Sequence, residues 1–414
     1  MAKIKKIIFL SGTPISKIVG DKIDPYWFQD HDFEVEYWGL QNIYYDKTAI
    51  NGYFSGNSDY KYIFPNTRIF SSKSEVSRAL IDLNNKVIIC FIDFRQQNDF
   101  WILRLFKKYK IRFYMGPKTI TIQVPIESDS KIINIIESKY KKIFKKNFFK
   151  RVGIKILKII FRYTDYYQHP IYIFSCGTKG RSLYAEISKE SKYISIPSVD
   201  IIGYKAPSLI QGKYCVYVEN NFHFSPDASL NEGDNHNVNI ELYEKNICSM
   251  FDLIEDELGL NIIISASGKY AYPDESIFGD REIIYFKTNQ LIQHSEMVIG
   301  HYSQGISQAI VNFKPLMLIQ DHSFNVNINI SIRGIAKIFK KKSLYATELT
   351  PSLIRQQFVI DKKHYQNLIQ EYFCEKGVKI ESKELIRNTL KNFKAHRERT
   401  EREQRETTSI SVRK

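Results

Sequence analysis

Short apolar runs that alternate with helical segments constrain the fold of this chain more than any other feature. Each run has four to six mainly apolar residues, rich in Ile, Val, Phe and Tyr, and a more polar stretch with helical spacing follows it. Strands buried on both faces of a parallel sheet have this near-continuous hydrophobicity, and their alternation with helices is typical of α/β folds. The predicted strands are residues 6–10, 35–38, 87–92, 171–175, 214–219, 262–265, 283–286, 297–300 and 316–319.

A long basic stretch interrupts this strand series once. No strand is predicted between residues 131 and 163, and a new series begins at Ile171. Because 414 residues are too many for one compact core, we expect two Rossmann-like domains. The predicted parts are a first domain at 1–130, a helical linker at 131–164, a second domain at 165–345, C-terminal helices at 346–395 that pack back across the junction, and a charged disordered tail at 396–414.

Composition excludes several classes of protein. With 43% hydrophobic and 25% charged residues, the chain is neither fibrous nor wholly disordered. Its five cysteines are widely spread and form no C-x-x-C pair, which argues against a disulfide scaffold or a zinc ribbon. The first apolar run ends at Ser11 after four residues, too early for a signal peptide, and no stretch of about 18 apolar residues occurs. These patterns predict a cytoplasmic protein without a membrane span.

The basic stretch has the pattern of an amphipathic helix. Residues 131–163 contain eleven Lys or Arg and a single acid, Glu137, so most of the net charge of +15 is local. Aromatic and aliphatic residues lie opposite the basic ones, as on helices that bind an anionic membrane surface. A solvated helix packed on the core is the alternative, whereas the near-neutral remainder of the chain argues against nucleic acid. The candidate membrane-contact residues are Lys141, Lys142, Lys145, Lys146 and Lys150.

Polar residues that directly follow the predicted strands are the candidate ligand-binding groups. Ligands of open parallel sheets bind at the carboxyl ends of the strands. The run at 297–300 leads into His301, Ser303 and Gln304 before a helical segment, which suits a phosphate or carboxylate. The same residues also fit a helix cap and a loop histidine without a ligand.

Two further strand ends carry candidate residues. Ser267 and Lys269 lie in a small-residue turn after residues 261–265, although this turn lacks the spacing of a P-loop. Glu219 directly follows an apolar strand, where it is either a general base or an acid that braces a loop. No H-E-x-x-H or similar spacing is present, so the residues predict no metal and no other cofactor.

Three stretches resemble a known family. They are Pro14 to Lys17 with residues 33–40, residues 216–227, and Lys287-Thr288 with residues 294–303 and Lys314-Pro315. Together they resemble the GT-B glycosyltransferases of bacterial capsule and lipopolysaccharide clusters. The resemblance implies two Rossmann-like domains that face each other across a cleft. It also implies a nucleotide-sugar donor held mainly by the second domain and an acceptor held mainly by the first.

The resemblance also implies roles for individual residues. The implied donor-binding residues are Ser267, Lys269, Lys287, Thr288, His301, Ser303 and Gln304, and the implied catalytic residues are Glu219 and His301. The implied reaction is an inverting, metal-independent transfer to a surface glycan or lipid-linked acceptor at the inner face of the bacterial cytoplasmic membrane. A CMP-activated acidic sugar is one donor that the resemblance allows.

The sequence departs from the family pattern at three places. It has Ser267-Gly268-Lys269 in place of His-Pro-Arg, Glu219-Asn220 in place of an acidic pair, and Ser225 in place of the histidine of the turn. A polyol-phosphate transferase on the same frame and a non-catalytic scaffold that binds nucleotide or glycan therefore stay open as alternatives.

Overall fold

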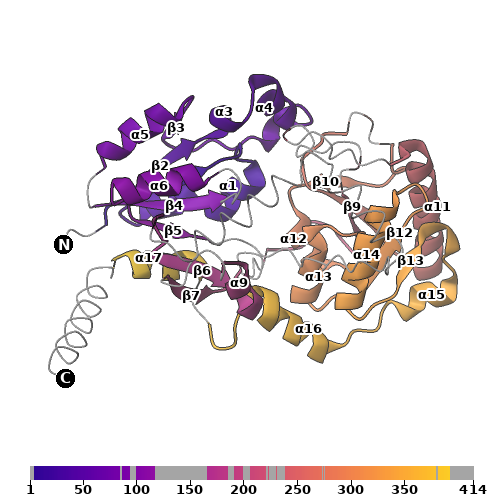
Figure 1. The fold of residues 1–414 in the computed structure, drawn as a ribbon. Helices are drawn as coiled ribbons and strands as arrows, with labels where there is room; N and C mark the ends of the chain where they lie inside the picture. The colour runs from indigo at the N-terminus through magenta and orange to yellow at the C-terminus, as the bar shows by residue number, and fades with distance from the viewer. Residues whose placement is uncertain are drawn as a thin grey trace, which may run out of the picture.

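The computed structural model contains two α/β units, each built around one parallel sheet (Figure 1). The structure describes residues 4–83, 86–93, 99–116, 166–184, 191–198, 206–220, 222, 230, 238–272, 274, 276–378 and 381–391. The predicted basic helix at 131–163, with its five candidate membrane-contact lysines, and the charged tail at 396–414 lie outside the described residues. Within the described ranges, no helix combines the length and hydropathy that crossing a bilayer requires.

The first sheet has seven parallel strands in the order β3-β2-β1-β4-β5-β6-β7. The chain therefore moves outward from β1 on one side and then returns to its other side, so a topological switch point lies between β1 and β4. The strands are β1 (Lys6–Ser11), β2 (Glu34–Gly39), β3 (Thr67–Ile69), β4 (Val87–Asp93), β5 (Phe113–Met115), β6 (Tyr172–Cys176) and β7 (Lys192–Ile196).

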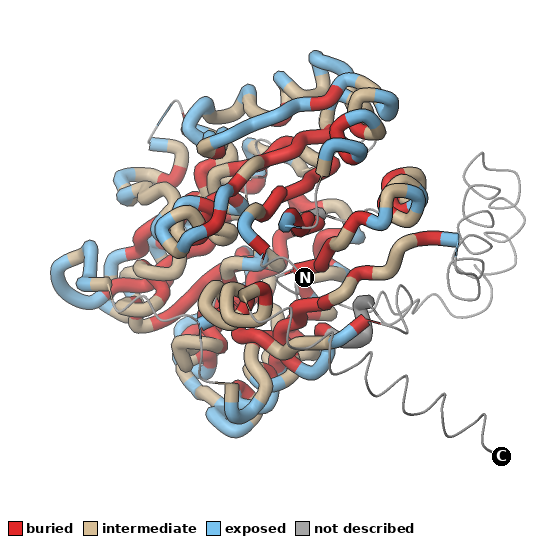
Figure 2. The backbone as a smooth tube through the Cα atoms, turned by 90° about the vertical axis from the view of Figure 1, so that its left-hand side faces the viewer, coloured by how far each residue is buried: buried red, intermediate tan, exposed pale blue. Residues whose placement is uncertain are grey.

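Helices cover both faces of this sheet, which explains the continuous hydrophobicity of its strands. Ile8 and Leu10 pack into one core cluster, whereas Ile7 and Phe9 pack into another on the opposite face. Figure 2 shows buried residues along the strands and exposed ones along the outer sides of the helices. The helices are α1 (Lys17–Ile23), α2 (Pro25–Asp30), α3 (Gln41–Tyr44), α4 (Lys47–Phe54), the 3-10 helix η1 (Ser58–Tyr60), α5 (Lys73–Ile81), α6 (Phe100–Lys108) and α9 (Gly177–Tyr184).

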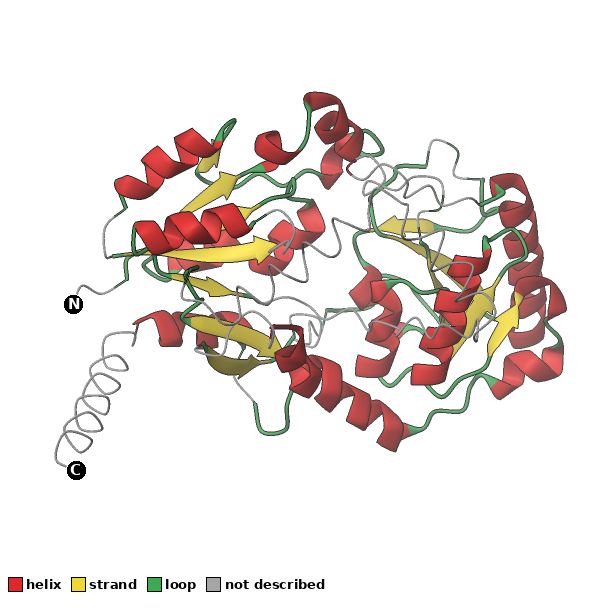
Figure 3. Cartoon of the chain, viewed as in Figure 1, coloured by secondary structure: helices red, strands yellow, loops and turns green. Residues whose placement is uncertain are grey.

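The second sheet, drawn with yellow strands on the right of Figure 3, has six parallel strands in the order β10-β9-β8-β11-β12-β13, with its switch point between β8 and β11. Its strands are β8 (Tyr214–Val218), β9 (Asn261–Ala266), β10 (Ile283–Tyr285), β11 (Met297–Gly300), β12 (Leu316–Gln320) and β13 (Ser343–Tyr345). Its helices are α11 (Ile240–Leu258), α12 (Thr288–His294), the 3-10 helices η2 (Gln304–Ile306) and η3 (Ala346–Glu348), α13 (Ser307–Val311) and α14 (Val326–Ile338).

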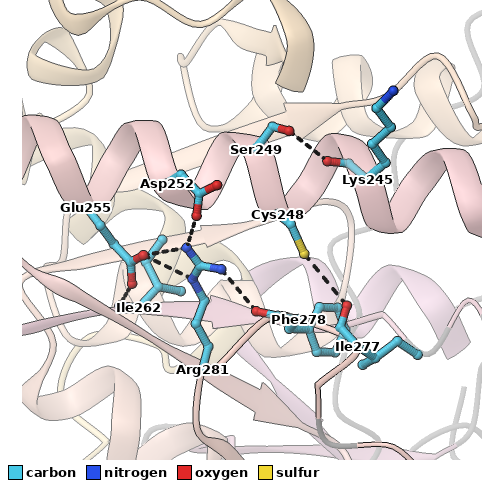
Figure 4. A network of polar contacts seen from close by, with 9 residues as sticks. All are labelled: Lys245, Cys248, Ser249, Asp252, Glu255, Ile262, Ile277, Phe278 and Arg281. Carbon is cyan, nitrogen blue, oxygen red and sulfur yellow. Dashed lines mark hydrogen bonds and ion pairs between the residues drawn. The ribbon is translucent and has the colours of Figure 1, made fainter.

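A polar network fixes the long helix α11 to the segment between β9 and β10 (Figure 4). The Arg281 guanidinium donates to Asp252 at 2.6 Å and to Glu255 on α11, and also to the carbonyl of Phe278 at 3.0 Å. Glu255 in turn accepts from the backbone N–H of Ile262 at 2.8 Å, at the start of β9. The helix, the strand and the loop are therefore held at one point.

The C-terminal helices return from the second unit to the first, as predicted. Helices α15 (Pro351–Gln356) and α16 (Lys362–Leu368) pack on the second core, and the π-helix η4 (Ile369–Phe373) contacts α9. The last helix, α17 (Ser382–Lys391), buries Ile386 and Leu390 in the core of the first sheet. In Figure 1, the yellow α17 accordingly lies beside the first unit.

The structure corrects one boundary predicted from the sequence. The strand at 171–175 was expected to open the second domain, which was placed at 165–345. That assignment was wrong, because β6 pairs with β5, Tyr114 lying opposite Tyr172, and β7 pairs with β6. The basic stretch is therefore an insertion between two neighbouring strands of one sheet, and a charge run was mistaken for a domain boundary.

Candidate functional site

The loops at the carboxyl ends of the two sheets meet. The side-chain amide of Asn57, after α4, donates to the carbonyl of Gly268, after β9, at 3.0 Å. The backbone N–H of Ala271 donates to the carbonyl of Gly56 at 2.9 Å. Carboxyl ends of parallel strands are where α/β units bind ligands, so these contacts join the two edges at which binding is expected.

Three hydroxyl groups converge at the switch point of the second sheet. Ser265, in β9, donates to Thr288 at 2.8 Å. Ser303 caps η2 and accepts from the N–H of Gly305 at 3.1 Å. A Cβ atom at Gly305 would lie 3.2 Å from Thr288 Cγ2 and 3.4 Å from Ser303 Oγ. The structure thus brings Thr288 and Ser303 together, and adds Ser265, which the sequence analysis did not identify.

The remaining predicted donor-binding residues lie in the turn after β9 and beside the hydroxyl-bearing residues in the chain. Ser267 Oγ accepts from the backbone N–H of Lys269 at 3.4 Å in the turn after β9. Lys287 is exposed and directly precedes Thr288, and Gln304 is exposed at the start of η2. Ammonium and hydroxyl groups of this kind suit an anionic ligand.

His301 is fully buried, and both of its ring nitrogens are hydrogen-bonded. Nδ1 lies 2.6 Å from the carbonyl oxygen of Ile319, so it must donate, and Nε2 accepts from the phenol of Tyr217 at 2.7 Å. Tyr217 is in turn hydrogen-bonded to the phenol of Tyr243. Burial lowers the pKa of His301 to about 4. This geometry does not support the predicted contact of His301 with a donor phosphate, because neither nitrogen is available without breaking a bond.

Glu219 lies among phenol groups at the other side of the same switch point. Its backbone N–H donates to the carbonyl of Ser265 at 3.1 Å, and its side chain is buried. Burial raises the pKa of Tyr272, and the neighbouring Glu219 carboxylate raises that pKa further. These contacts fit an acid that braces a loop, and the catalytic role of Glu219 stays a prediction.

The switch point of the first sheet holds a carboxylate that the sequence analysis did not identify. Tyr44, in α3, donates to Asp99 Oδ1 at 2.6 Å and accepts from the indole N–H of Trp101 at 3.0 Å. A Cβ atom at Gly12, directly after β1, would lie 3.0 Å from the Tyr44 ring and 3.8 Å from Asp99 Oδ1. Asp99 directly precedes α6 and comes six residues after the end of β4, so the start of the helix was the available signal in the sequence.

No protein-family model matches the chain, and no curated protein sequence is similar to it. Solved structures do match. A variant of the wall teichoic acid polymerase TagF with one histidine replaced by alanine has a TM-score of 0.50 at 13% identity, covering 96% of this chain and 90% of that one. The glycosyltransferase SnogD from Streptomyces nogalater has a TM-score of 0.47 at 9% identity, covering 89% and 95% of the two chains.

The UDP-GlcNAc 2-epimerase from Methanocaldococcus jannaschii has a TM-score of 0.44 at 11% identity, covering 88% of this chain and 98% of that one. At such low sequence identities, these matches show a similarity of fold only. With the two parallel sheets and the returning C-terminal helices, the match to TagF establishes that this chain has the GT-B fold that its sequence predicted.

Proposed function

We propose that this protein is a glycosyltransferase that moves a sugar from a nucleotide-sugar donor to a surface glycan or a lipid-linked acceptor. One observation carries the proposal: the two sheets meet at their carboxyl edges, with the hydroxyl cluster at one switch point and the Tyr44–Asp99 pair at the other. Substrates bound at two neighbouring switch points are held close to each other, so that a bimolecular reaction becomes effectively intramolecular.

The second unit would hold the donor. Thr288 and Ser303 offer hydroxyl groups for a phosphate, and Lys269 and Lys287 supply positive charge near them. That charge would stabilise the nucleotide leaving group as its bond to the sugar breaks, the part a metal ion plays in other transferases. His301 would orient the loop after β11 through its bonds to Tyr217 and Ile319, without touching the donor.

The first unit would hold the acceptor. An inverting transfer needs one base that takes the proton of the acceptor hydroxyl while its oxygen forms the new bond to the sugar. We assign this role to Asp99 in preference to Glu219, because Asp99 lies on the acceptor unit and Tyr44 orients its carboxylate. In a transfer assay, Asp99→Asn should reduce kcat far more than Glu219→Gln, and the opposite order would return the role to Glu219.

Thermal shifts of the purified protein with CMP, CDP, UDP, GDP and dTDP, each with and without Mg²⁺, test the donor site. A nucleotide that binds the folded chain at about 100 times its Kd should stabilise it by about 2.7 kcal/mol. Thr288→Val should abolish the shift, whereas Ser249→Ala, which removes a hydroxyl on the distant α11, should retain it. No shift with any nucleotide would contradict the transferase and favour a scaffold with another ligand.

A polyol-phosphate transferase is the second candidate, favoured by the match to a wall teichoic acid polymerase over 96% of this chain. A CDP-alcohol donor that is turned over, with no turnover of nucleotide sugars, would select it. The proposed location for either enzyme is the inner face of the cytoplasmic membrane, held there by the basic stretch at 131–163. Sedimentation with anionic vesicles, compared with neutral ones, tests that location.

A further inference from the structure

One loop of the first unit, at Gly56 and Asn57, is hydrogen-bonded to the turn after β9 in the second unit. This turn carries Ser267 and Lys269 and is called the donor loop below. The two bonds between these loops, from Asn57 to Gly268 and from Ala271 to Gly56, enclose Lys269 and Tyr270 between them. The backbone on which Lys269 is carried is therefore fixed by residues that belong to the opposite unit.

The backbone of this donor loop has little freedom to adopt another shape. Gly268 has a φ of +78°, and a Cβ atom there would lie 2.0 Å from Cζ of Phe286. Phe286 itself has a φ of +59°, an unfavourable conformation for a bulky residue, and packs against a cluster that contains Tyr53 and Tyr60 of the first unit. Unfavourable conformations of this kind persist only where the surroundings impose them, and here the surroundings include the first unit.

We propose that Asn57 is a positioning residue for the donor: it holds the Gly268 carbonyl, and thereby the turn that carries Ser267 and Lys269, in the form that binds a nucleoside diphosphate. The inference rests on the proposed function and deepens it, because it gives the acceptor unit a part in donor binding. If the contact between the units raises the affinity for the donor by some factor, the bound donor must strengthen that contact by the same factor.

The variant Asn57→Ala, with Asn66→Ala as its matched control, tests this inference. Asn66 makes the same kind of bond, to the carbonyl of Val35 at 3.0 Å, but within the first unit. We expect Asn57→Ala to weaken nucleotide binding, measured by calorimetry, about tenfold. We expect kcat at saturating donor and the melting temperature to stay close to those of Asn66→Ala. Asn57→Asp should behave like the alanine variant, because a carboxylate cannot donate to the Gly268 carbonyl.

Hydrogen exchange of the Ala271 amide gives a second readout that needs no ligand. Its N–H donates to Gly56, so we expect it to exchange faster in Asn57→Ala than in Asn66→Ala. Unchanged exchange, or faster exchange with unchanged nucleotide affinity, overturns the inference and leaves the proposed function intact. If the wild-type protein binds none of the nucleotides, the proposed function fails, and the donor role of Asn57 fails with it.

Discussion

The hydrogen bonds of His301 fix both its tautomer and its charge. Nδ1 donates to a carbonyl and Nε2 accepts from the Tyr217 phenol, so a proton on Nε2 would break the second bond. The ring is also enclosed by aromatic side chains, with Phe324 and Phe222 at centroid distances of 4.9 and 5.4 Å. Such surroundings disfavour the charged form, so the imidazole is neutral at physiological pH.

This burial predicts a loss of stability in mild acid. The pKa of His301 is about 4 in the folded chain, below its ordinary value of 6.5, so between these values the unfolded chain binds more protons. The contribution of the buried, neutral His301 to the free energy of unfolding is therefore complete above about pH 6.5. This contribution is lost as the pH falls towards 4, by on the order of 3 kcal/mol. Urea unfolding followed by far-ultraviolet circular dichroism at pH 7 and pH 5 measures it.

His301→Asn should be less stable than the wild type at pH 7, yet should lose less stability between pH 7 and pH 5. His322→Ala removes a half-exposed imidazole that stacks on Tyr345, and should keep the wild-type pH dependence. An equal pH dependence in His301→Asn and wild type would show that another group is responsible.

The positions of individual site residues were predictable from the sequence, but their roles were not. Ser303, Glu219 and His301 were identified because they follow strands, and Thr288 through the family resemblance. The role of His301 depends on Tyr217, which is 84 residues away in the chain and meets it only through the pairing of β8 with β11. No local pattern carries that information.

At the scale of elements, Arg281 connects the long helix α11 to the segment between β9 and β10. Its side chain is only 11% exposed and contacts two acids on α11 as well as the loop that leads to β10. Removal of Arg281 would leave Glu255, whose side chain is 27% exposed, without its charged hydrogen-bond donor, which is destabilising. The ion pair between Lys213 and Glu296, by contrast, is exposed at both side chains, at 76% and 42%.

We therefore expect Arg281→Ala to lower the free energy of unfolding by about 1.5–3 kcal/mol, and Arg281→Lys to recover part of that loss. Lys213→Ala should cost less than about 1 kcal/mol, because exposed ion pairs contribute little. Urea midpoints and m-values of the three variants would test the difference, and equal losses for Arg281→Ala and Lys213→Ala would contradict it.

The elements that the sequence predicted are those with enough apolar residues to be buried on both faces. Each predicted run coincides with a strand, from β1 to β12. Strands β3, β5 and β13 were not predicted, because none of them lies in a run of four apolar residues. Strand β10 is equally short, but it was predicted because it lies in the apolar run at 283–286. Strand β7 was also missed, since four of its five residues are exposed or only partly buried at the end of the sheet.

At the scale of the whole molecule, the first unit is made from two separate parts of the chain. Residues 4–198 supply its sheet, and α17 completes its core with Ile386 and Leu390. Sequence patterns predicted that the C-terminal helices return, but could not predict which sheet receives each of them. That choice depends on which apolar residues the folded chain brings together on each sheet, and those are far apart in the sequence.

Leu390→Ala should destabilise the first unit selectively, by about 2–4 kcal/mol, because it leaves a cavity in that core. All three tryptophans, Trp27, Trp38 and Trp101, lie in the first unit, so intrinsic fluorescence during urea unfolding reports on that unit.

Ile63→Ala changes an apolar residue of the same unit that is 76% exposed, and should leave the fluorescence midpoint nearly unchanged. If the fluorescence midpoint of Leu390→Ala equals that of Ile63→Ala, α17 does not contribute to the stability of the first unit.

The return of α17 also decides the order in which the protein can be completed during synthesis. A ribosome that has made the last strand of the first sheet still has to make the whole second unit before Ile386 and Leu390 exist. At about 5–20 residues per second, that interval lasts on the order of 10–40 s. The second unit is continuous in the chain, so we expect it to reach its native state on the ribosome before the first. Until then, the nascent first unit exposes the apolar residues that α17 later covers, and this surface is where we expect chaperones to bind.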